Sequence, residues 1–386
     1  MMKKKVCVVT GTRAEFGILS RLIKCIDVEE CFDLQLIVTG MHLSPEFGLT
    51  YKEIESYGLK INKKIEILLS SDTPIGISKS MGLAQISFAE AFEELQPDII
   101  ILLGDRFEIF SAASAALVAT IPIAHIHGGE TTEGAIDESF RHSITKMSHI
   151  HFTSTEEYKN RIIQLGENPN YIFNVGSLGI ENIVHTPLTT KRDLEKQLGF
   201  KFKEKNILVT YHPETTKKNT AANFQSILNS LQKLKKTQII FTKSNADSNG
   251  RIINTMIDSF VASYENSYQT TSLGQKNYYN CLKYVDLVIG NSSSGIIEVP
   301  SFNIPTINIG NRQQGRVQSK SILNCNPITK EIDHAIQYSY SVKFKNLFNT
   351  NQNPYEKMDS CKNIIRHLKK SLTSIPIAKH FFDIKY

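Results

Sequence analysis

The sequence predicts an α/β protein built from two doubly wound domains. Short apolar runs alternate with helical patterns from residue 6 to about residue 180, and a second series of the same kind begins at residue 206. Most of these runs are apolar on both faces, as expected for strands of a parallel sheet that helices cover on both sides. A chain of 386 residues also exceeds the usual size of one domain, so we expect two domains with separate cores.

The expected elements follow this alternation along the chain. In the first series, strands are expected at residues 6–10, 34–40, 98–104, 121–127, 149–154 and 171–177, with helical segments such as AEFGILSRLIKCI and ISFAEAFEELQ between them. In the second series, strands are expected at residues 206–212, 237–244, 287–293 and 306–312. A polar, charged stretch over residues 181–205 separates the two series, which places the domains at residues 1–182 and 183–355.

The tail, residues 356–386, contains one amphipathic stretch, MDSCKNIIRHLKKSL. Four of its residues, Cys361, Ile364, Ile365 and Leu368, share one face of a helix. We therefore expect a C-terminal helix with a single apolar face.

Composition and charge narrow the class of function. The 44 Lys and Arg residues against 38 Asp and Glu give a net charge of +6 without a strong basic cluster, which argues against nucleic-acid binding and suits an anionic small molecule. The six cysteines form no CxxC pair, as is typical of reduced thiols in a cytosolic protein. No apolar run approaches the ~20 residues of a membrane span, and the N-terminal run breaks early into a polar turn. We therefore expect a cytoplasmic protein that binds no membrane.

Polar motifs stand where the expected strands end. The first domain carries GTRAE, MH, DR and GGE at these places, and the second carries HPET, NSSSG and GNRQQGR. Ligands of open α/β sheets bind beyond the carboxyl ends of the strands. Two such edges suggest a cleft between the domains with one shared substrate.

The stretch NSSSGIIEVPSF gives the clearest signal for a phosphate site. It begins with residues that start helices: Asn291, Ser292, Ser293, Ser294 and Gly295. Free N–H groups at a helix start bind anions, although an ordinary helix cap has the same pattern. Arg312 and Arg316 follow the next strand, and their planar guanidinium groups suit diphosphate oxygens. Glu298 is placed to accept from ribose hydroxyls, although a solvated carboxylate would look the same.

The motif GTRAEFG follows the first strand but lacks the GxGxxG spacing of a dinucleotide site. A dehydrogenase is therefore a weak interpretation. Arg13 is expected to bring a positive charge to a phosphate, with an ordinary surface arginine as the alternative.

Residues 125–142, HIHGGETTEGAIDESFRH, gather histidines, carboxylates and an arginine. Asp137 with Arg141 and Glu138 with His142 are i,i+4 pairs, which would give ordinary ion pairs on a helix surface. A metal site at His125 and His127, which share a strand face, is a second possibility. The third is proton transfer, because several carboxylates crowded in a cleft cannot all ionise cheaply. Asp105, at the end of a neighbouring strand, and His212, from the second domain, would join such a group.

Taken together, the motifs resemble those of the UDP-N-acetylglucosamine 2-epimerase superfamily. TGTRAEFG, LGDRFEIFSAASAAL, HIHGGE, DESFRHSITKMSHIHFTSTEEY, YHPET, GNSSSGIIEVPS and NIGNRQQGR occur in the family's order from about residue 3 to about residue 320. More narrowly, the chain looks like the hydrolysing branch, the bacterial NeuC or SiaA type that makes N-acetylmannosamine for sialic acid.

The resemblance implies a fold, an assembly and a reaction. The fold would be GT-B, with two Rossmann-like domains, an inter-domain cleft and a C-terminal helix that returns to the first domain. The protein would act on a UDP-sugar as a homodimer or homotetramer, with no nicotinamide or metal cofactor. UDP and the C2 proton would leave to give 2-acetamidoglucal, and water would then add to C1 while C2 is reprotonated on the opposite face.

The resemblance also implies site residues. The catalytic candidates are Asp105, His127, Glu130, Asp137 and His212. The candidates for substrate contacts are Arg13, His42, Arg106, Glu138, Arg141, Asn245, Ser292, Ser293, Ser294, Gly295, Glu298, Arg312 and Arg316. Some hydrolysing members carry glutamate where this chain has His127, so the proton role of that glutamate falls to Glu130 or to His127 itself.

Other functions share some of these features. A relative that acts on a nucleotide-linked 2,4-diacetamido-2,4,6-trideoxy sugar would use the same chemistry, in the legionaminic acid pathway, and the residues around C4 and C6 cannot be identified from the sequence. A non-hydrolysing epimerase fits the DESFRHSITKMSHIH stretch less well. A GT-B glycosyltransferase would need an acceptor and no proton exchange at C2, and a nucleotide-sugar sensor would bind without turnover.

Overall fold

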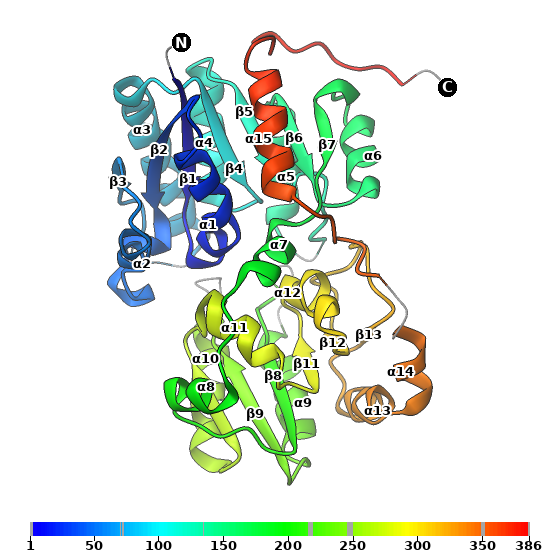
Figure 1. The fold of residues 1–386 in the computed structure, drawn as a ribbon. Coiled ribbons are helices and arrows are strands. Elements are labelled where there is room, and N and C mark those ends of the chain that lie inside the picture. The colour runs from blue at the N-terminus through cyan, green and yellow to red at the C-terminus, as the bar shows by residue number, and fades with distance from the viewer. Residues whose placement is uncertain are drawn as a thin grey trace. The chain divides into compact units, whose positions relative to one another are not determined.

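The computed structural model describes residues 3–69, 71, 73–133, 135–214, 219–244, 250–348 and 352–384. The chain divides into two compact units. The first unit comprises Met1–Glu130, Asp137–Asn182 and Lys357–Tyr386, and the second comprises Thr131–Ile136 and Ile183–Glu356. Each unit is a parallel sheet with helices on its two faces (Figure 1). None of the described helices has the length and apolar character needed to cross a membrane.

The sheet of the first unit has seven strands in the order β3-β2-β1-β4-β5-β6-β7. Their bounds are β1 Lys4–Thr10, β2 Phe32–Thr39, β3 Lys63–Ile65, β4 Ile99–Leu103, β5 Ile123–Ile126, β6 Ile150–Thr153 and β7 Ile172–Asn174. The α-helices are α1 Arg13–Asp27, α2 Tyr51–Ser56, α3 Pro74–Leu95, α4 Phe107–Val118, α5 Asp137–Met147, α6 Glu156–Gln164, α7 Leu178–His185 and α15 Ser360–Ser371. The last residues of α7 belong to the second unit. The short 3-10 helices are η1 Gly40–Leu43, η2 Pro45–Phe47 and η3 Pro169–Tyr171.

Burial on both faces explains why the strands are apolar throughout. Val6 and Val8 of β1 belong to a core with α1 and α15, whereas Cys7 and Val9 belong to a core with α3 and α4 on the other face. Successive side chains of a strand point to opposite faces, so a strand between two helical layers has no solvent-facing positions to make polar.

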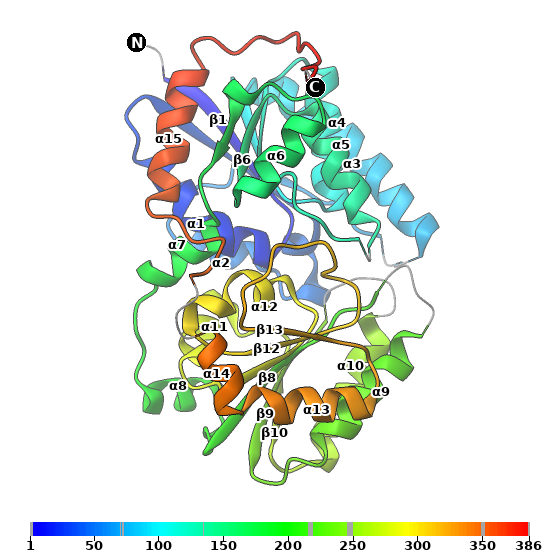
Figure 2. The same cartoon turned by 90° about the vertical axis from the view of Figure 1, so that its right-hand side faces the viewer.

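The helix expected at the C-terminal end is α15, and its apolar face is buried in the first unit (Figure 2). Cys361, Ile364, Ile365 and Leu368 all lie in the core that contains α1. The start of the helix is held by two hydrogen bonds: Ser360 Oγ donates to the Val175 carbonyl at 2.7 Å, and the Cys361 amide donates to a Glu181 carboxylate at 2.7 Å.

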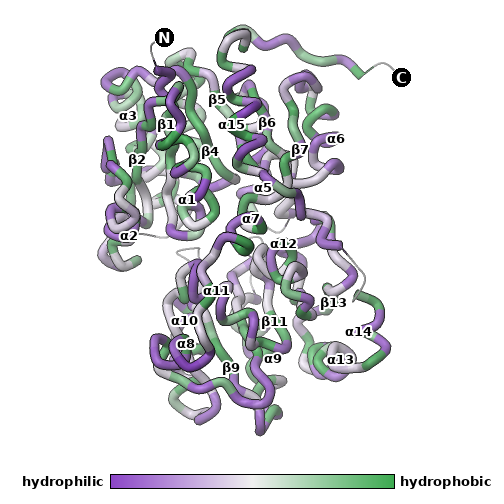
Figure 3. The backbone as a smooth tube through the Cα atoms, viewed as in Figure 1, coloured by the Kyte–Doolittle hydropathy of each residue, from purple (hydrophilic) through white to green (hydrophobic). Residues whose placement is uncertain are grey.

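The sheet of the second unit has six strands in the order β10-β9-β8-β11-β12-β13. The strands are β8 Lys205–Thr210, β9 Thr237–Thr242, β10 Ser267–Thr270, β11 Leu287–Gly290, β12 Thr306–Ile309 and β13 Ile322–Cys325. The helices are α8 Lys191–Leu198, α9 Thr220–Leu231, α10 Gly250–Ser263, α11 Gly274–Leu282, α12 Ser293–Ile297, α13 Thr329–Ser339 and α14 Val342–Phe348, with the 3-10 helix η4 Val299–Phe302. Its surface helix α8 is largely hydrophilic (Figure 3).

In both sheets the strand order reverses beside the first strand, between β1 and β4 in one and between β8 and β11 in the other. Loops that leave adjacent strands on opposite faces part at such a point and leave room for a ligand. The expected polar motifs DR and GTRAE follow β4 and β1, and HPET and NSSSG follow β8 and β11. Both pairs of motifs therefore lie at the switch points of their own sheets.

Candidate functional site

In the first unit, Asp105 and Arg141 form the centre of a cluster of charged groups. Asp105 follows β4, and Arg141, from the second turn of α5, is 3% exposed. One terminal nitrogen of Arg141 is ion-paired with the Asp105 carboxylate, and the other donates to the His127 carbonyl at 2.8 Å. A single buried guanidinium thus holds the ends of β4 and β5, whose residues Leu103 and Ile126 are in register.

His127 and Glu130 complete this cluster. His127 follows β5 with φ of +62°, a left-handed conformation that is costly outside glycine and that recurs at functional sites. Its Nδ1 lies 3.5 Å from Glu130 Oε1, and Glu130 also accepts from Ser154 Oγ at 2.7 Å. Glu130 is 1% exposed, and its other oxygen lies 4.0 Å from Arg141. The structure therefore brings Asp105, His127, Glu130 and Arg141 together.

Asp137 and Glu138 are the first two residues of α5, where carboxylates favour the helix start. Glu138 accepts from His142 at 3.1 Å, one of the two i,i+4 pairs expected from the sequence. Arg141, the expected partner of Asp137, extends to Asp105, which is 36 residues away in the chain.

Two of the histidines are packing residues. His125 is fully buried, its Nε2 contacts the Gly104 carbonyl at 2.7 Å and its Nδ1 contacts Thr145 Oγ1 at 3.2 Å, so neither nitrogen is left for a metal. Burial lowers the pKa of His125 to about 3, which keeps the ring neutral. His42, expected to contact substrate, is also fully buried between Thr10 and Thr50, and burial lowers its pKa to about 4. We therefore leave His42 out of the proposed site.

Two arginines lie at the switch point of the first sheet. Arg13 is the first residue of α1 and is ion-paired with Glu53 at 2.8 Å. Arg106 donates to Glu108 at 2.7 Å and lies 4.0 Å from Glu15. The carboxylates of Glu15 and Glu108 are both buried. Burial and the neighbouring Glu108 raise the pKa of Glu15 to about 8, whereas the charge of Arg106 acts in the opposite direction. The sequence did not indicate this pair of carboxylates, because Glu15 also matches the capping box that starts α1.

In the second unit, His212 and Asn291 join the two strands of the switch point. The His212 amide donates to Asn291 Oδ1 at 2.7 Å, and Asn291 Nδ2 donates to the His212 carbonyl at 2.8 Å. His212 Nδ1 lies 3.3 Å from Ser244 Oγ, which fixes the plane of the ring. Asn291 therefore ties β11 to β8 rather than capping α12.

The serines that follow Asn291 start α12, with Ser292 as the N-cap residue in an extended conformation. Ser292, Ser293 and Ser294 are partly exposed, whereas Gly295 is buried against Thr306. Ser294 Oγ lies 2.6 Å from the Tyr278 hydroxyl. The Glu298 carboxylate accepts from the Tyr279 hydroxyl at 2.8 Å, and burial raises the pKa of Glu298. The two tyrosines of α11 were not recognised in the sequence, since aromatic residues in a helix are usually packing residues.

Arg312 lies at the end of β11. Its Nη1 donates to the Asn291 carbonyl at 3.2 Å, and Gln313 donates to the same oxygen at 2.8 Å. The loop is further held by Glu214, which is 2% exposed and accepts from the Asn311 amide at 2.7 Å. The motif HPET thus supplies a structural carboxylate two residues after His212.

Gly310, between β12 and Arg312, has φ of +82°, and a Cβ atom there would lie 2.1 Å from Glu214 Oε1. Gly310→Ala is expected to destabilise the second unit by about 1 kcal/mol through backbone strain and by a further ~1–3 kcal/mol through the clash. Gly199→Ala is the matched control, because Gly199 has φ of +75° with nothing within 4 Å. Thermal unfolding followed by circular dichroism measures both, and equal losses would show that the approach of Glu214 has no energetic weight.

Arg316, which we expected to contact the diphosphate, has protein partners within the second unit. It is 9% exposed, and within the second unit it donates to the Thr131 carbonyl at 2.8 Å and to Thr132 Oγ1 at 3.3 Å. The adjacent Gly315 lies close to Glu133, because a Cβ atom on Gly315 would be 2.4 Å from Glu133 Oε1. Arg316 therefore holds Thr131 and Thr132, which follow Glu130 directly in the chain. Asn245, the remaining candidate, lies outside the described residues.

Comparisons with known proteins show the family of the chain. Residues 24–369 match the model of the UDP-N-acetylglucosamine 2-epimerase family. The chain is 46% identical to the GDP/UDP-N,N'-diacetylbacillosamine 2-epimerase (hydrolyzing) of Campylobacter jejuni, over 89% of this chain and 90% of the relative. It is 41% identical to the polysialic acid biosynthesis protein P7 of Escherichia coli, over 99% and 98%.

The fold is also that of solved enzymes. The complex of MnaA from S. aureus with UDP matches with a TM-score of 0.82 over 98% of this chain and 100% of that one, at 17% identity. This likeness establishes the GT-B-like fold of two Rossmann-like units expected from the sequence. The chain therefore belongs to the UDP-N-acetylglucosamine 2-epimerase family and is a nucleotide-sugar 2-epimerase.

Proposed function

We propose that the protein is a hydrolysing 2-epimerase whose substrate is a nucleotide-linked 2,4-diacetamido-2,4,6-trideoxy sugar. The observation that carries the proposal is the cluster of Asp105, His127, Glu130 and Arg141 at the ends of β4 and β5. The name of the Campylobacter jejuni relative supports the choice of sugar. The products would be the nucleoside diphosphate and the free sugar with inverted configuration at C2.

The chemistry requires groups that remove a proton from C2 and return one to its opposite face. We assign these transfers to Asp105 and to the His127–Glu130 pair, because separate partners hold them: Arg141 orients Asp105, and Ser154 orients Glu130. Positioned acid and base groups of this kind typically accelerate a reaction by ~10²–10⁴-fold. Asp137 and His212 stay in the proposed catalytic set on the strength of the family motifs.

Departure of the diphosphate requires cations and donors at the leaving group. In the proposed assignment, the diphosphate lies at the start of α12, beside Ser292 and Ser293, and Arg312 supplies the positive charge. Arg312 is suited to this role because the Asn291 carbonyl fixes its guanidinium over the end of β11. Glu298 would accept from the ribose hydroxyls.

A second candidate substrate is UDP-N-acetylglucosamine, which would give N-acetylmannosamine for sialic acid. The polysialic acid name of the Escherichia coli relative, which matches almost the whole chain, favours it. The two substrates differ at C4 and C6, where one has an acetamido and a methyl group and the other has two hydroxyls. The acid and base groups serve both equally.

Parallel assays of the purified protein with the two nucleotide sugars test the proposal. Release of UDP and of free sugar is measured by chromatography and NMR. We expect kcat/KM for the diacetamido substrate to exceed that for UDP-N-acetylglucosamine at least tenfold. A reversed preference would establish the second candidate, and epimerised sugar that remains attached to UDP would rule out the hydrolysing reaction.

Arg312 and Arg316 are expected to respond differently to substitution. Arg312→Gln should raise KM and the Kd for UDP by roughly tenfold or more, since a charge-assisted contact of about 1.5–3 kcal/mol is lost. Arg316→Gln should leave the Kd for UDP within about twofold and lower kcat, because Arg316 holds the segment next to Glu130 and Asp137. Calorimetric titration with UDP and steady-state kinetics separate the two effects. Weaker UDP binding by the Arg316 variant would restore the diphosphate role for that residue.

A further inference from the structure

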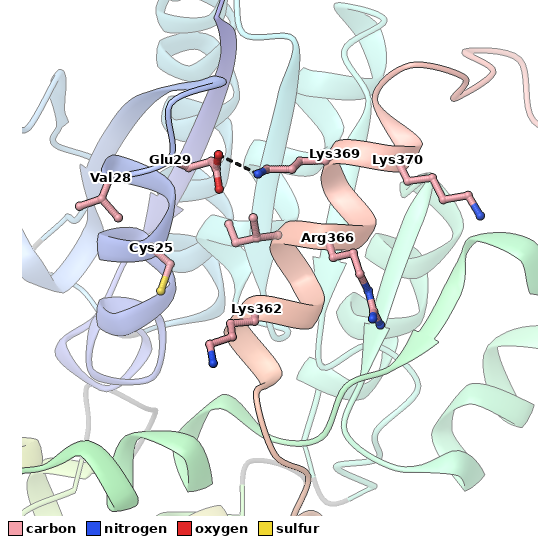
Figure 4. Close-up of a pocket in the computed structure, with 8 residues that line it drawn as sticks. Cys25, Val28, Glu29, Lys362, Arg366, Lys369 and Lys370 are labelled. Carbon is pink, nitrogen blue, oxygen red and sulfur yellow. Dashed lines mark ion pairs between the residues drawn. The ribbon is translucent and has the colours of Figure 1, made fainter.

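A groove of about 670 Å³ lies in the first unit between α1 and α15, away from the strand ends that carry the proposed catalytic cluster (Figure 4). Its lining residues are Cys25, Val28, Glu29, Lys362, Ile365, Arg366, Lys369 and Lys370. Figure 4 shows Cys25 on α1, and Lys369 reaching from α15 to Glu29, with which it is ion-paired at 2.7 Å. The groove gives a small molecule access to a cysteine that is otherwise packed against the core.

Cys25 has a second thiol as its neighbour. Cys361, from the first turn of α15, is buried in the core on which Cys25 packs. Interaction with the Cys361 thiol lowers the pKa of Cys25 to about 7, and Arg21 and Lys362 add to the effect against the opposing influence of burial and Glu181. The interaction with Cys25, followed by burial and the nearby Glu181, raises the pKa of Cys361, so Cys361 is the proton donor of the pair.

The charges of the groove select the kind of molecule that reaches Cys25. Four cations and one carboxylate line it, and the four cationic side chains are exposed. Lys369 is paired with Glu29 and Lys362 with Asp359, and Arg366 and Lys370 add further positive charge to the lining. An excess of positive charge raises the local concentration of anions and the rate at which they arrive.

We propose that Cys25 and Cys361 are a thiol–disulfide site that small anionic disulfides oxidise through this groove. The Cys25 thiolate attacks one sulfur of the disulfide, which forms a mixed disulfide on Cys25 and releases the first anionic thiol. Cys361 then gives up its proton and attacks the Cys25 sulfur, which forms the Cys25–Cys361 bond and releases the second thiol. Two protein thiols are oxidised and one small disulfide is reduced to two thiols. The product fixes α15, the helix with which the chain returns to the first unit, covalently to α1.

The test uses the full chain, reduced and freed of reductant, at pH 7.5 and low salt. It is incubated with glutathione disulfide, which is anionic, or with 2-hydroxyethyl disulfide, which is neutral. Intact-mass spectrometry and peptide mapping follow the reaction. We expect the loss of two hydrogen atoms and a Cys25–Cys361 cross-link, with a rate for the anionic reagent that falls several-fold in about 0.5 M salt while the rate for the neutral reagent does not.

Variants locate the two steps. Cys361→Ser should stop at a glutathione mixed disulfide on Cys25, Cys25→Ser should give neither product, and Cys31→Ser, which removes an exposed thiol of the same unit, should change nothing. Arg366→Gln with Lys370→Gln should slow the anionic reagent about threefold at low salt and leave the neutral one unaffected.

Wild-type protein in which Cys31 is the main site of modification, or which ends as a stable mixed disulfide on Cys25, would overturn the proposal. So would equal salt dependence for the two reagents, which would remove the role of the groove charges. The wild-type mapping is decisive by itself if a variant fails to fold.

Discussion

Asp105→Asn is expected to lower kcat by roughly 10²–10⁴-fold while the Kd for UDP changes less than about twofold. The amide keeps the size of the side chain but cannot accept a proton, and it loses the ion pair that Arg141 makes with the carboxylate. The diphosphate contacts are assigned to other residues, so nucleotide binding should persist. Steady-state kinetics and calorimetric titration with UDP give the two quantities.

Asp98→Asn is the matched control for this substitution. Asp98 stands just before β4, at the opposite end of the strand that leads to Asp105, and it accepts from Lys4 and from the Lys5 amide at 2.8 Å. Its replacement should leave kcat within about twofold. If the two variants retain similar activity, Asp105 takes no part in proton transfer and the catalytic assignment is wrong.

The second large effect is expected at Arg141. Arg141→Met fills a similar volume but leaves the Asp105 carboxylate and the His127 carbonyl without their buried donor. Breaking a buried ion pair from one side typically costs about 3–5 kcal/mol. Since Asp105 keeps some exposure, we expect a loss of about 3 kcal/mol in the first unit and a nearly inactive enzyme. The unfolding midpoint should fall by roughly 6 °C or more.

Arg192→Met, an exposed arginine on α8, should change the unfolding midpoint by less than about 2 °C. Retention of stability by the Arg141 variant would mean that water replaces its contacts. The double variant Asp105→Asn with Arg141→Met tests the pair itself, because removing both charges should recover part of the stability lost in the single arginine variant.

Much of the fold follows from the alternation of apolar runs. The interior strands, such as β4 with the sequence IIILL, are buried on both faces and therefore carry a strong signal. Three strands were not predicted: β3, β10 and β13, with the sequences KKI, SYQT and ILNC. Each is at the edge of its sheet, where strands are short and partly exposed, so neither length nor hydrophobicity distinguishes them from loops.

Ligands of such sheets gather at strand ends, so the motifs after β4 and β5 were expected to lie together, and they do. The contacts of individual side chains were harder to predict from the sequence. The sequence pattern offered Asp137 as a helix neighbour for Arg141, but it did not reveal the pair of Arg141 with Asp105, which comes from a different strand end. Arg316 is held by Thr131 and Thr132, about 185 residues earlier in the chain, which no local pattern reveals.

A hydrolysing 2-epimerase exchanges the C2 proton of its substrate with solvent, and NMR in D₂O detects this exchange. The protein is incubated with the diacetamido nucleotide sugar and, separately, with UDP-N-acetylglucosamine, and the products are followed in time. We expect free sugar with inverted configuration and deuterium at C2, together with UDP. Free sugar that keeps its original C2 proton, or substrate that stays intact in both samples, would contradict this expectation.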